Sequence, residues 1–315
     1  MASQLILQRL GLALLTLLGV SMFIFWTTEV LPGDIASRVL GRQATEEAKQ
    51  AFRDELNLER PVYERYGLWL TDALRGDFGK SLVSGRPVVD AVLPRLHNTL
   101  ILAGYAFIIY VPVSLLLAII AALYRDRTPD IVVSLFNLLG LALPEFVLGT
   151  LLIYVFAVQY PLFPVMSMIH KAETLAQILH VTTLPALTLM TAMAVYSIRM
   201  LRDNLIEVLQ SDYILMCTMK GLGRVRIVIL HALPNAAIPA LNTMALNLTY
   251  LIGGVVVVEQ VFAYQGLGSL LVESVFLRDA PVIEAVALLS SALYIIANLV
   301  ADLLAIVLNP RLRSR

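Results

Sequence analysis

Six long stretches of this 315-residue chain are mostly apolar, and they constrain the fold more than any other feature. A bilayer core about 30 Å thick is crossed by a helix of about 20 mostly apolar residues. Each of the six is long enough. The sequence therefore predicts an all-α membrane protein with six transmembrane helices, at residues 8–29, 98–124, 131–158, 182–202, 235–258 and 282–308.

Composition agrees with a membrane protein. Hydrophobic residues make up 59% of the chain and charged residues 15%, whereas soluble domains have about 45–50% and about 25%. The single cysteine, Cys217, excludes an intrachain disulfide and a cysteine-based metal cluster. The first apolar stretch lacks a small-residue cleavage site and exceeds the usual length of a signal sequence, so we interpret it as a retained anchor.

Basic residues in the short connecting segments predict the orientation. The short loops opposite the N-terminus carry only Lys171 and Arg278. The positive-inside rule then places both termini in the cytoplasm. The basic residues assigned to the cytoplasmic side are Arg9, Arg125, Arg127, Arg199, Arg202, Lys220, Arg224, Arg226, Arg311, Arg313 and Arg315.

The loop at 30–97 is long enough to contain structure of its own. Thr45 followed by Glu46 and Glu47 is typical of a helix start, because an acidic first turn favours the helix dipole. A second helix is predicted from Pro61. Its inward face would carry Val62, Tyr66, Trp69, Leu70 and Ala73. We expect one membrane domain over 1–315 with a periplasmic helical insert at 30–97.

A polar, basic segment at 203–234 interrupts the apolar pattern. We expect a helix over Asp203–Met219, ended by Gly221, and a short helix over Arg224–Ala232. The inner face of the short helix would carry Val225, Val228 and Ile229. Two interpretations remain: an interfacial helix held by lipid headgroups, or a docking site for a partner that supplies energy.

No enzyme signature accompanies these spans. The Gly79-Lys80-Ser81 sequence resembles the end of a phosphate-binding loop, but Leu74 stands where that loop needs glycine. A nucleophile-elbow pattern is also lacking. Any ATPase that drives this protein is therefore expected to be a separate chain.

Glu145 lies inside the third apolar stretch, directly after Pro144. A carboxylate in a membrane span is costly unless it faces water or a partner, and proline frees a carbonyl one turn earlier. The pair could line a translocation pathway, or Glu145 could form a structural hydrogen bond to another helix. For Asp302, in the last span, a structural role is favoured.

Several short motifs occur in an order that resembles one family. The loop motifs, Asp212-Tyr213, Lys220-Gly221-Leu222 and His231-Ala232-Leu233 with Asn235, resemble the "EAA" loop of permeases in bacterial ATP-binding-cassette (ABC) importers of the dipeptide, oligopeptide and nickel group. The long first loop resembles that of the B-type subunit. Further matching motifs are Leu31-Pro32-Gly33-Asp34, Gly76-Asp77-Phe78-Gly79-Lys80-Ser81, Arg95 with Asn98-Thr99-Leu100, Val258-Glu259, Gly266-Leu267-Gly268, Arg278-Asp279 with Pro281-Val282, and Asn309-Pro310-Arg311.

The resemblance implies an inner-membrane permease of the type I importer kind that pairs with a related permease, two ATPases and a periplasmic solute-binding protein. ATP and Mg would bind to the ATPases, and this chain would bind no cofactor or metal. The binding protein would contact Gly266, Leu267 and Gly268, with Gly266 and Gly268 forming tight turns. The residues expected to couple to an ATPase are Asp212, Tyr213, Lys220, Gly221, Leu222, Arg224 and His231.

Three positions depart from the family pattern, namely Cys217, Met219 and Asn309. The bulkier side chains at 217 and 219 would alter packing against the ATPase. Peptides are the first substrate expected, with nickel, opines, glutathione and sugars as alternatives. A non-ATP secondary carrier, in which Glu145 couples to protons, is the competing function.

Overall fold

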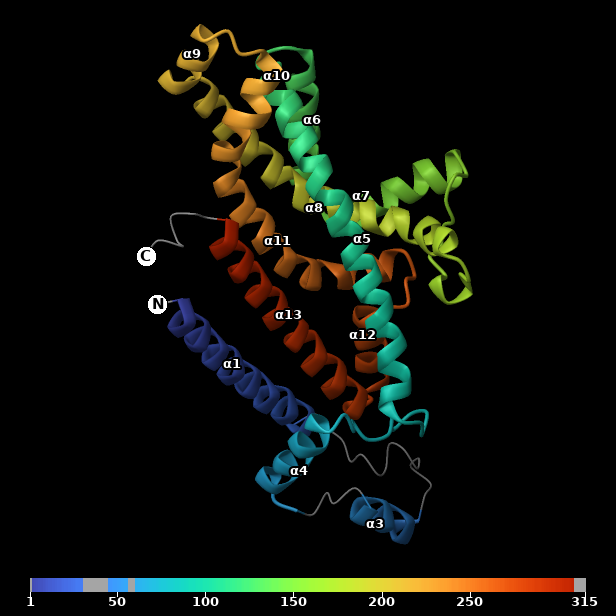
Figure 1. Cartoon of the computed structure of the whole chain (residues 1–315). Helices are drawn as coiled ribbons and strands as arrows, with labels where there is room; N and C mark the ends of the chain where they lie inside the picture. The colour runs from blue at the N-terminus through green and yellow to red at the C-terminus, as the bar shows by residue number, and fades with distance from the viewer. Residues whose placement is uncertain (1, 31–44, 56–59, 309–315) are drawn as a thin grey trace. The chain divides into compact units, whose positions relative to one another are not determined.

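The computed structural model describes residues 2–30, 45–55 and 60–308, and all regular secondary structure in these ranges is helical (Figure 1). The motifs at 31–34 and 309–311 lie outside the described residues. Short π-helical segments occupy Tyr154–Gln159 and Ile227–Ala232, and Ile169–Lys171 forms a 3-10 turn. The α-helices are α1 (Ala2–Val30), α3 (Glu46–Glu55), α4 (Val62–Leu74), α5 (Val88–Leu123), α6 (Thr128–Ala142), α7 (Glu145–Ile153), α8 (Leu175–Leu209), α9 (Asp212–Met219), α10 (Arg224–Arg226), α11 (Leu233–Val261), α12 (Leu267–Leu277) and α13 (Ala280–Leu308).

The predicted all-α membrane fold is confirmed. Within the described residues, five helices are long and apolar enough to cross a membrane, or up to seven if each of two bent pairs counts as one span. All six predicted stretches fall on these helices. The fourth is longer than predicted, because α8 starts at Leu175, where Thr174 and Gln177 form a capping box.

The third predicted span is sharply broken. Helices α6 and α7 meet at 114°. Leu143 is extended, and Pro144 follows as the residue before α7. Proline cannot donate the next helical hydrogen bond and disfavours helical geometry in the residue before it. The helix break therefore coincides with Pro144, and it is a change of direction rather than a gentle bend.

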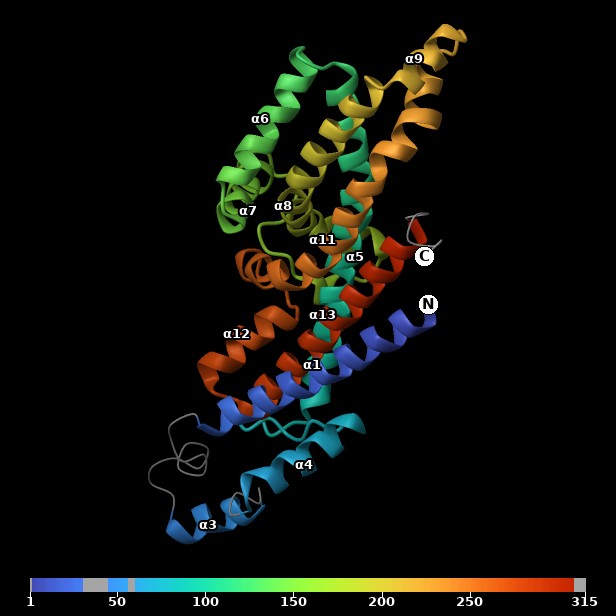
Figure 2. The same cartoon turned by 90° about the vertical axis from the view of Figure 1, so that its left-hand side faces the viewer.

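The described part of the chain divides into two compact units, and the first comprises the described residues of Met1–Ala2, Thr99–Gln265 and Ile296–Arg315. Helix α8 lies at its centre and packs against α6, α7 and α11 (Figure 2). A buried hydrogen-bonded group joins three of its helices. The amide Nδ2 of Asn247 donates to the hydroxyls of Tyr110 at 2.7 Å and Ser197 at 3.2 Å, and those two hydroxyls lie 2.5 Å apart.

The second unit comprises the described residues of Ser3–Asn98 together with Gly266–Ile295. Helices α3 and α4 confirm the two helices predicted in the 30–97 insert. Helix α4 packs on α1 through an aromatic cluster of Phe25, Tyr66 and Trp69, and the Tyr66 hydroxyl lies 2.8 Å from that of Ser21. Val62 was predicted on the inward face but is exposed, because it lies one turn before the contact with α1. The division into one domain, an insert and a coupling loop stays a prediction.

The substitution Asn247→Leu tests the polar group between α5, α8 and α11. It removes the amide donor while Tyr110 and Ser197 can still bond to each other, so we expect a loss of about 1 kcal/mol in the free energy of unfolding. Unfolding in detergent measures this value. Thr150→Val is the control, because the Thr150 hydroxyl is exposed and bonds within its own helix. Equal stability of the two variants would contradict the assigned role.

Candidate functional site

The loop between α8 and α11 is a compact helical element. Helix α8 continues to Leu209, and a turn at Gln210–Ser211 separates it from α9. The prediction of one continuous helix over Asp203–Met219 was therefore wrong. The Ser211 backbone is extended and its hydroxyl donates to the Val208 carbonyl at 2.6 Å, which ends one helix and begins the next.

Gly221 ends α9 as predicted, with a positive φ of 77° that glycine adopts without strain. The following short helix confirms the predicted inner face only at Val228. Its buried residues are Ile227, Val228 and Ala232. Val225 and Ile229 are exposed, because Ile227–Ala232 is a π-helix whose hydrogen bonds each span one residue more than in an α-helix. That change rotates the side chains relative to an α-helical pattern.

Three polar residues close the loop at its base. The Tyr213 hydroxyl donates to the backbone carbonyl of His231. The amide of Asn235 donates to the same carbonyl at 3.0 Å and to the Tyr213 hydroxyl at 3.1 Å. These bonds join the start of α9 to the start of α11, so both ends of the loop are held together.

The other predicted coupling residues lie around this base. Arg224 donates from Nη2 to the Leu123 carbonyl at the end of α5, at 2.8 Å. Leu222 is half-buried against the core, whereas Asp212 and Lys220 are exposed. The loop thus contacts α5 as well as the two helices it connects.

The loop exposes several large apolar side chains that were not predicted from sequence. Met219 is 73% exposed and Val225 is 71% exposed. Large exposed apolar patches on a polar rim mark interaction sites, and methionine adapts to varied partners. The name apolar loop face is used below for the exposed large apolar side chains of the loop, which are Leu215, Met216, Met219, Val225, Ile229 and Leu230. The unusual Met219 could have indicated it from sequence.

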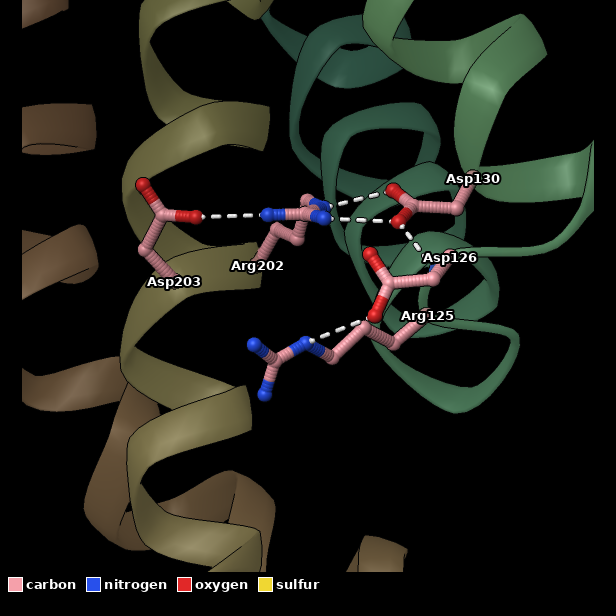
Figure 3. Close-up of polar contacts among 5 residues, drawn as sticks. All are labelled: Arg125, Asp126, Asp130, Arg202 and Asp203. Atoms are coloured by element: carbon pink, nitrogen blue, oxygen red, sulfur yellow. Dashed lines mark hydrogen bonds and ion pairs between the residues drawn. The ribbon is translucent and has the colours of Figure 1, made fainter.

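A charge cluster holds the start of α6 against the end of α8, just before the loop (Figure 3). The guanidinium of Arg202 donates from Nε and Nη2 to both carboxylate oxygens of Asp130, each at 2.6 Å. Arg202 also donates to Asp203 at 2.8 Å, and the Asp126 N–H donates to Asp130 at 2.9 Å. Asp130 is only 3% exposed. Arg202 was predicted from sequence only as a loop charge, because a single sequence does not show which charges on different spans meet.

The predicted pathway residues also lie in the first unit. Pro144 precedes α7, and Glu145 is its first residue. The Glu145 carboxylate is half-buried and accepts a hydrogen bond from the Tyr250 hydroxyl of α11. Among the described residues, no group of three or more His, Cys, Asp and Glu side chains could hold a metal ion.

The segment predicted to contact a binding protein lies in the second unit. Gly266, Leu267 and Gly268 are buried, and Leu267 packs with Leu270 and Val282. Gly266 precedes α12 and Gly268 lies inside it, so Gly268 does not form the predicted tight turn. The exposed side chains of α12 are nearer its end, where Phe276 is 83% exposed.

Comparison with known proteins covers nearly the whole chain. Residues 114–314 match the family described as binding-protein-dependent transport system inner membrane component, and residues 2–103 match its N-terminal region. The chain is 38% identical over 310 residues to the glutathione transport system permease protein GsiC of Escherichia coli K12, covering 98% of this chain and 99% of that protein. The protein of the same name from Shigella flexneri serotype 5b is 37% identical over the same coverage.

Substitutions at Asp130 and Arg202 test the charge cluster. Asp130→Asn removes the buried counter-charge of Arg202 and leaves it only the exposed Asp203. We therefore expect unfolding in detergent to show a loss of about 2 kcal/mol. Combining Asp130→Leu with Arg202→Met removes both charges. We expect the double variant to lose less stability than the sum of its single variants. Additive losses would show that the two side chains do not depend on each other.

Proposed function

Since this chain belongs to the family of binding-protein-dependent transport system inner membrane components, as a permease subunit of an ABC importer, we propose that it forms half of the translocation pore and is driven by a separate ATPase. The ATPase contact would be the loop over 212–232. The observation that carries this proposal is the apolar loop face on a loop closed at its base by hydrogen bonds.

Coupling requires a part that moves as one body. The Tyr213–His231–Asn235 hydrogen bonds hold the two ends of the loop, and Arg224 joins it to the end of α5. A displacement of the apolar loop face by a bound partner would therefore be transmitted to α5, α8 and α11 together. ATP and Mg²⁺ would bind to the partner, which would supply the hydrolysis.

The proposed assembly has this chain, a related permease, two ATPases and a periplasmic solute-binding protein. In the proposed orientation both termini and the 203–234 loop are cytoplasmic, which the basic residues of the short loops support. The 30–97 insert and α12 would then face the periplasm. Gly266, Leu267 and Gly268 would position α12 so that its exposed residues meet the binding protein.

Glutathione or another short peptide is the proposed substrate. The two relatives described above are named for glutathione transport and match along nearly their whole length. This supports the peptide class over nickel, opines and sugars. Pro144 and Glu145 would lie on the pathway, because a half-buried carboxylate between apolar helices is costly when it faces lipid.

The double variant Leu215→Asp with Met219→Asp tests the docking surface. Charge on the apolar loop face should oppose burial against the ATPase, so we expect at least a tenfold reduction in co-purified ATPase and in ATP-driven uptake. The chain should still fold, because both side chains are exposed. Leu74→Asp, at the exposed end of α4, is the matched control and should leave both measurements unchanged. Normal ATPase recovery from the double variant would refute docking through this face.

Uptake measurements test the substrate. Proteoliposomes that contain the purified complex and its binding protein should accumulate radiolabelled glutathione only when ATP is present on the side of the ATPases. An excess of unlabelled glutathione should suppress this signal, whereas an excess of nickel or glucose should not. Suppression by nickel or glucose instead would overturn the assignment to peptides.

A further inference from the structure

Glu145 lies at the break between α6 and α7. Leu143 and Pro144 are extended, and α7 starts again with Glu145 as its first residue. The start of a helix favours negative charge, because its N–H groups point outward there. The break therefore places Glu145 where a negative charge is favoured.

Helix α11 completes the surroundings of this carboxylate. The Tyr250 hydroxyl donates to Glu145 Oε1. One turn further, a Cβ atom added to Gly254 would lie 3.3 Å from both carboxylate oxygens. The glycine therefore leaves the space that the carboxylate occupies, and the tyrosine holds the carboxylate there.

This arrangement stabilises the carboxylate without neutralising it. A phenol is a neutral donor, and no basic side chain among the described residues forms an ion pair with Glu145. The group is half-buried rather than enclosed, and Tyr250 is 46% exposed. A charge in this position is expensive against lipid, and a cationic group placed beside it would offset that cost.

We propose that Glu145, held by Tyr250 beside Gly254, binds the ammonium group of the transported solute. The inference rests on the proposed function, because it assigns an amine-bearing substrate class to the proposed pathway. A peptide or glutathione carries one free α-amino group, which suits a single carboxylate. Sugars carry no such cation, so the site would favour peptides over them during passage.

Uptake by the reconstituted complex tests the assignment, with radiolabelled glutathione and its N-acetylated form as probes. Glu145→Gln should lower glutathione uptake at least tenfold, and Glu145→Asp should lower it less. The variant-to-wild-type ratio for the N-acetylated probe should stay near one, since that probe has no ammonium group. Taking ratios removes any preference of the binding protein. Thr150→Val, on the exposed side of α7, should leave uptake of both probes unchanged.

The outcomes separate the inference from the proposed function. Glu145→Gln uptake equal to wild type for glutathione, or lowered equally for both probes, would overturn the ammonium site while leaving glutathione import intact. A wild-type complex that does not import glutathione would overturn the substrate assignment instead. In that case, the solute that co-purifies with the binding protein is identified. A solute without a cationic group would contradict the proposed ammonium site at Glu145. Recovery of the ATPases with each variant in the same ratio as with wild type shows that the variant complex is assembled.

Discussion

A polar group inside an apolar helix must find a partner within the protein or face water, and this constraint organises the first unit. Asn247 joins three helices by bonding to Tyr110 and Ser197. Glu259, which is fully buried near the end of α11, accepts a 2.6 Å hydrogen bond from Thr99 of α5. Such contacts determine which helix faces turn toward each other, because apolar surfaces alone do not distinguish neighbouring helices from lipid.

The same constraint connects the coupling loop to the rest of the unit. The Asp130–Arg202 ion pair secures α6 to α8 directly before the loop begins. Arg224 and Tyr213 then secure the loop to α5 and to the start of α11. A displacement at the loop would therefore move several helices rather than bend one connection. The α6–α7 break that carries Glu145 belongs to the same unit.

The spans, the helices of the 30–97 insert and the loop hinge at Gly221 could be predicted from sequence. They depend on apolar length, capping residues and backbone freedom, which are local properties. The buried face of Ile227–Ala232 could not, because a π-helix shifts the side-chain register. The angle between α6 and α7 at Pro144 could not be predicted either. Proline marks a break in the helix, but packing against α8 and α11 determines the direction of α7 after the break.

The residues of the candidate sites also differ in whether they could be predicted from sequence. The coupling residues were found from short motifs, whereas Arg202 and Asp130 lie on separate helices and meet only in the folded unit. Glu145 stood out as a carboxylate in an apolar stretch, but its partners Tyr250 and Gly254 come from a helix more than a hundred residues later. Contacts between distant helices are therefore what the structure adds.

Coupling to an ATPase can be tested by affinity purification of this chain from its native host in detergent, with identification of the co-eluting proteins. We expect a related permease together with one or two ATPases. A homo-oligomer that elutes without any ATPase would contradict coupling through the loop.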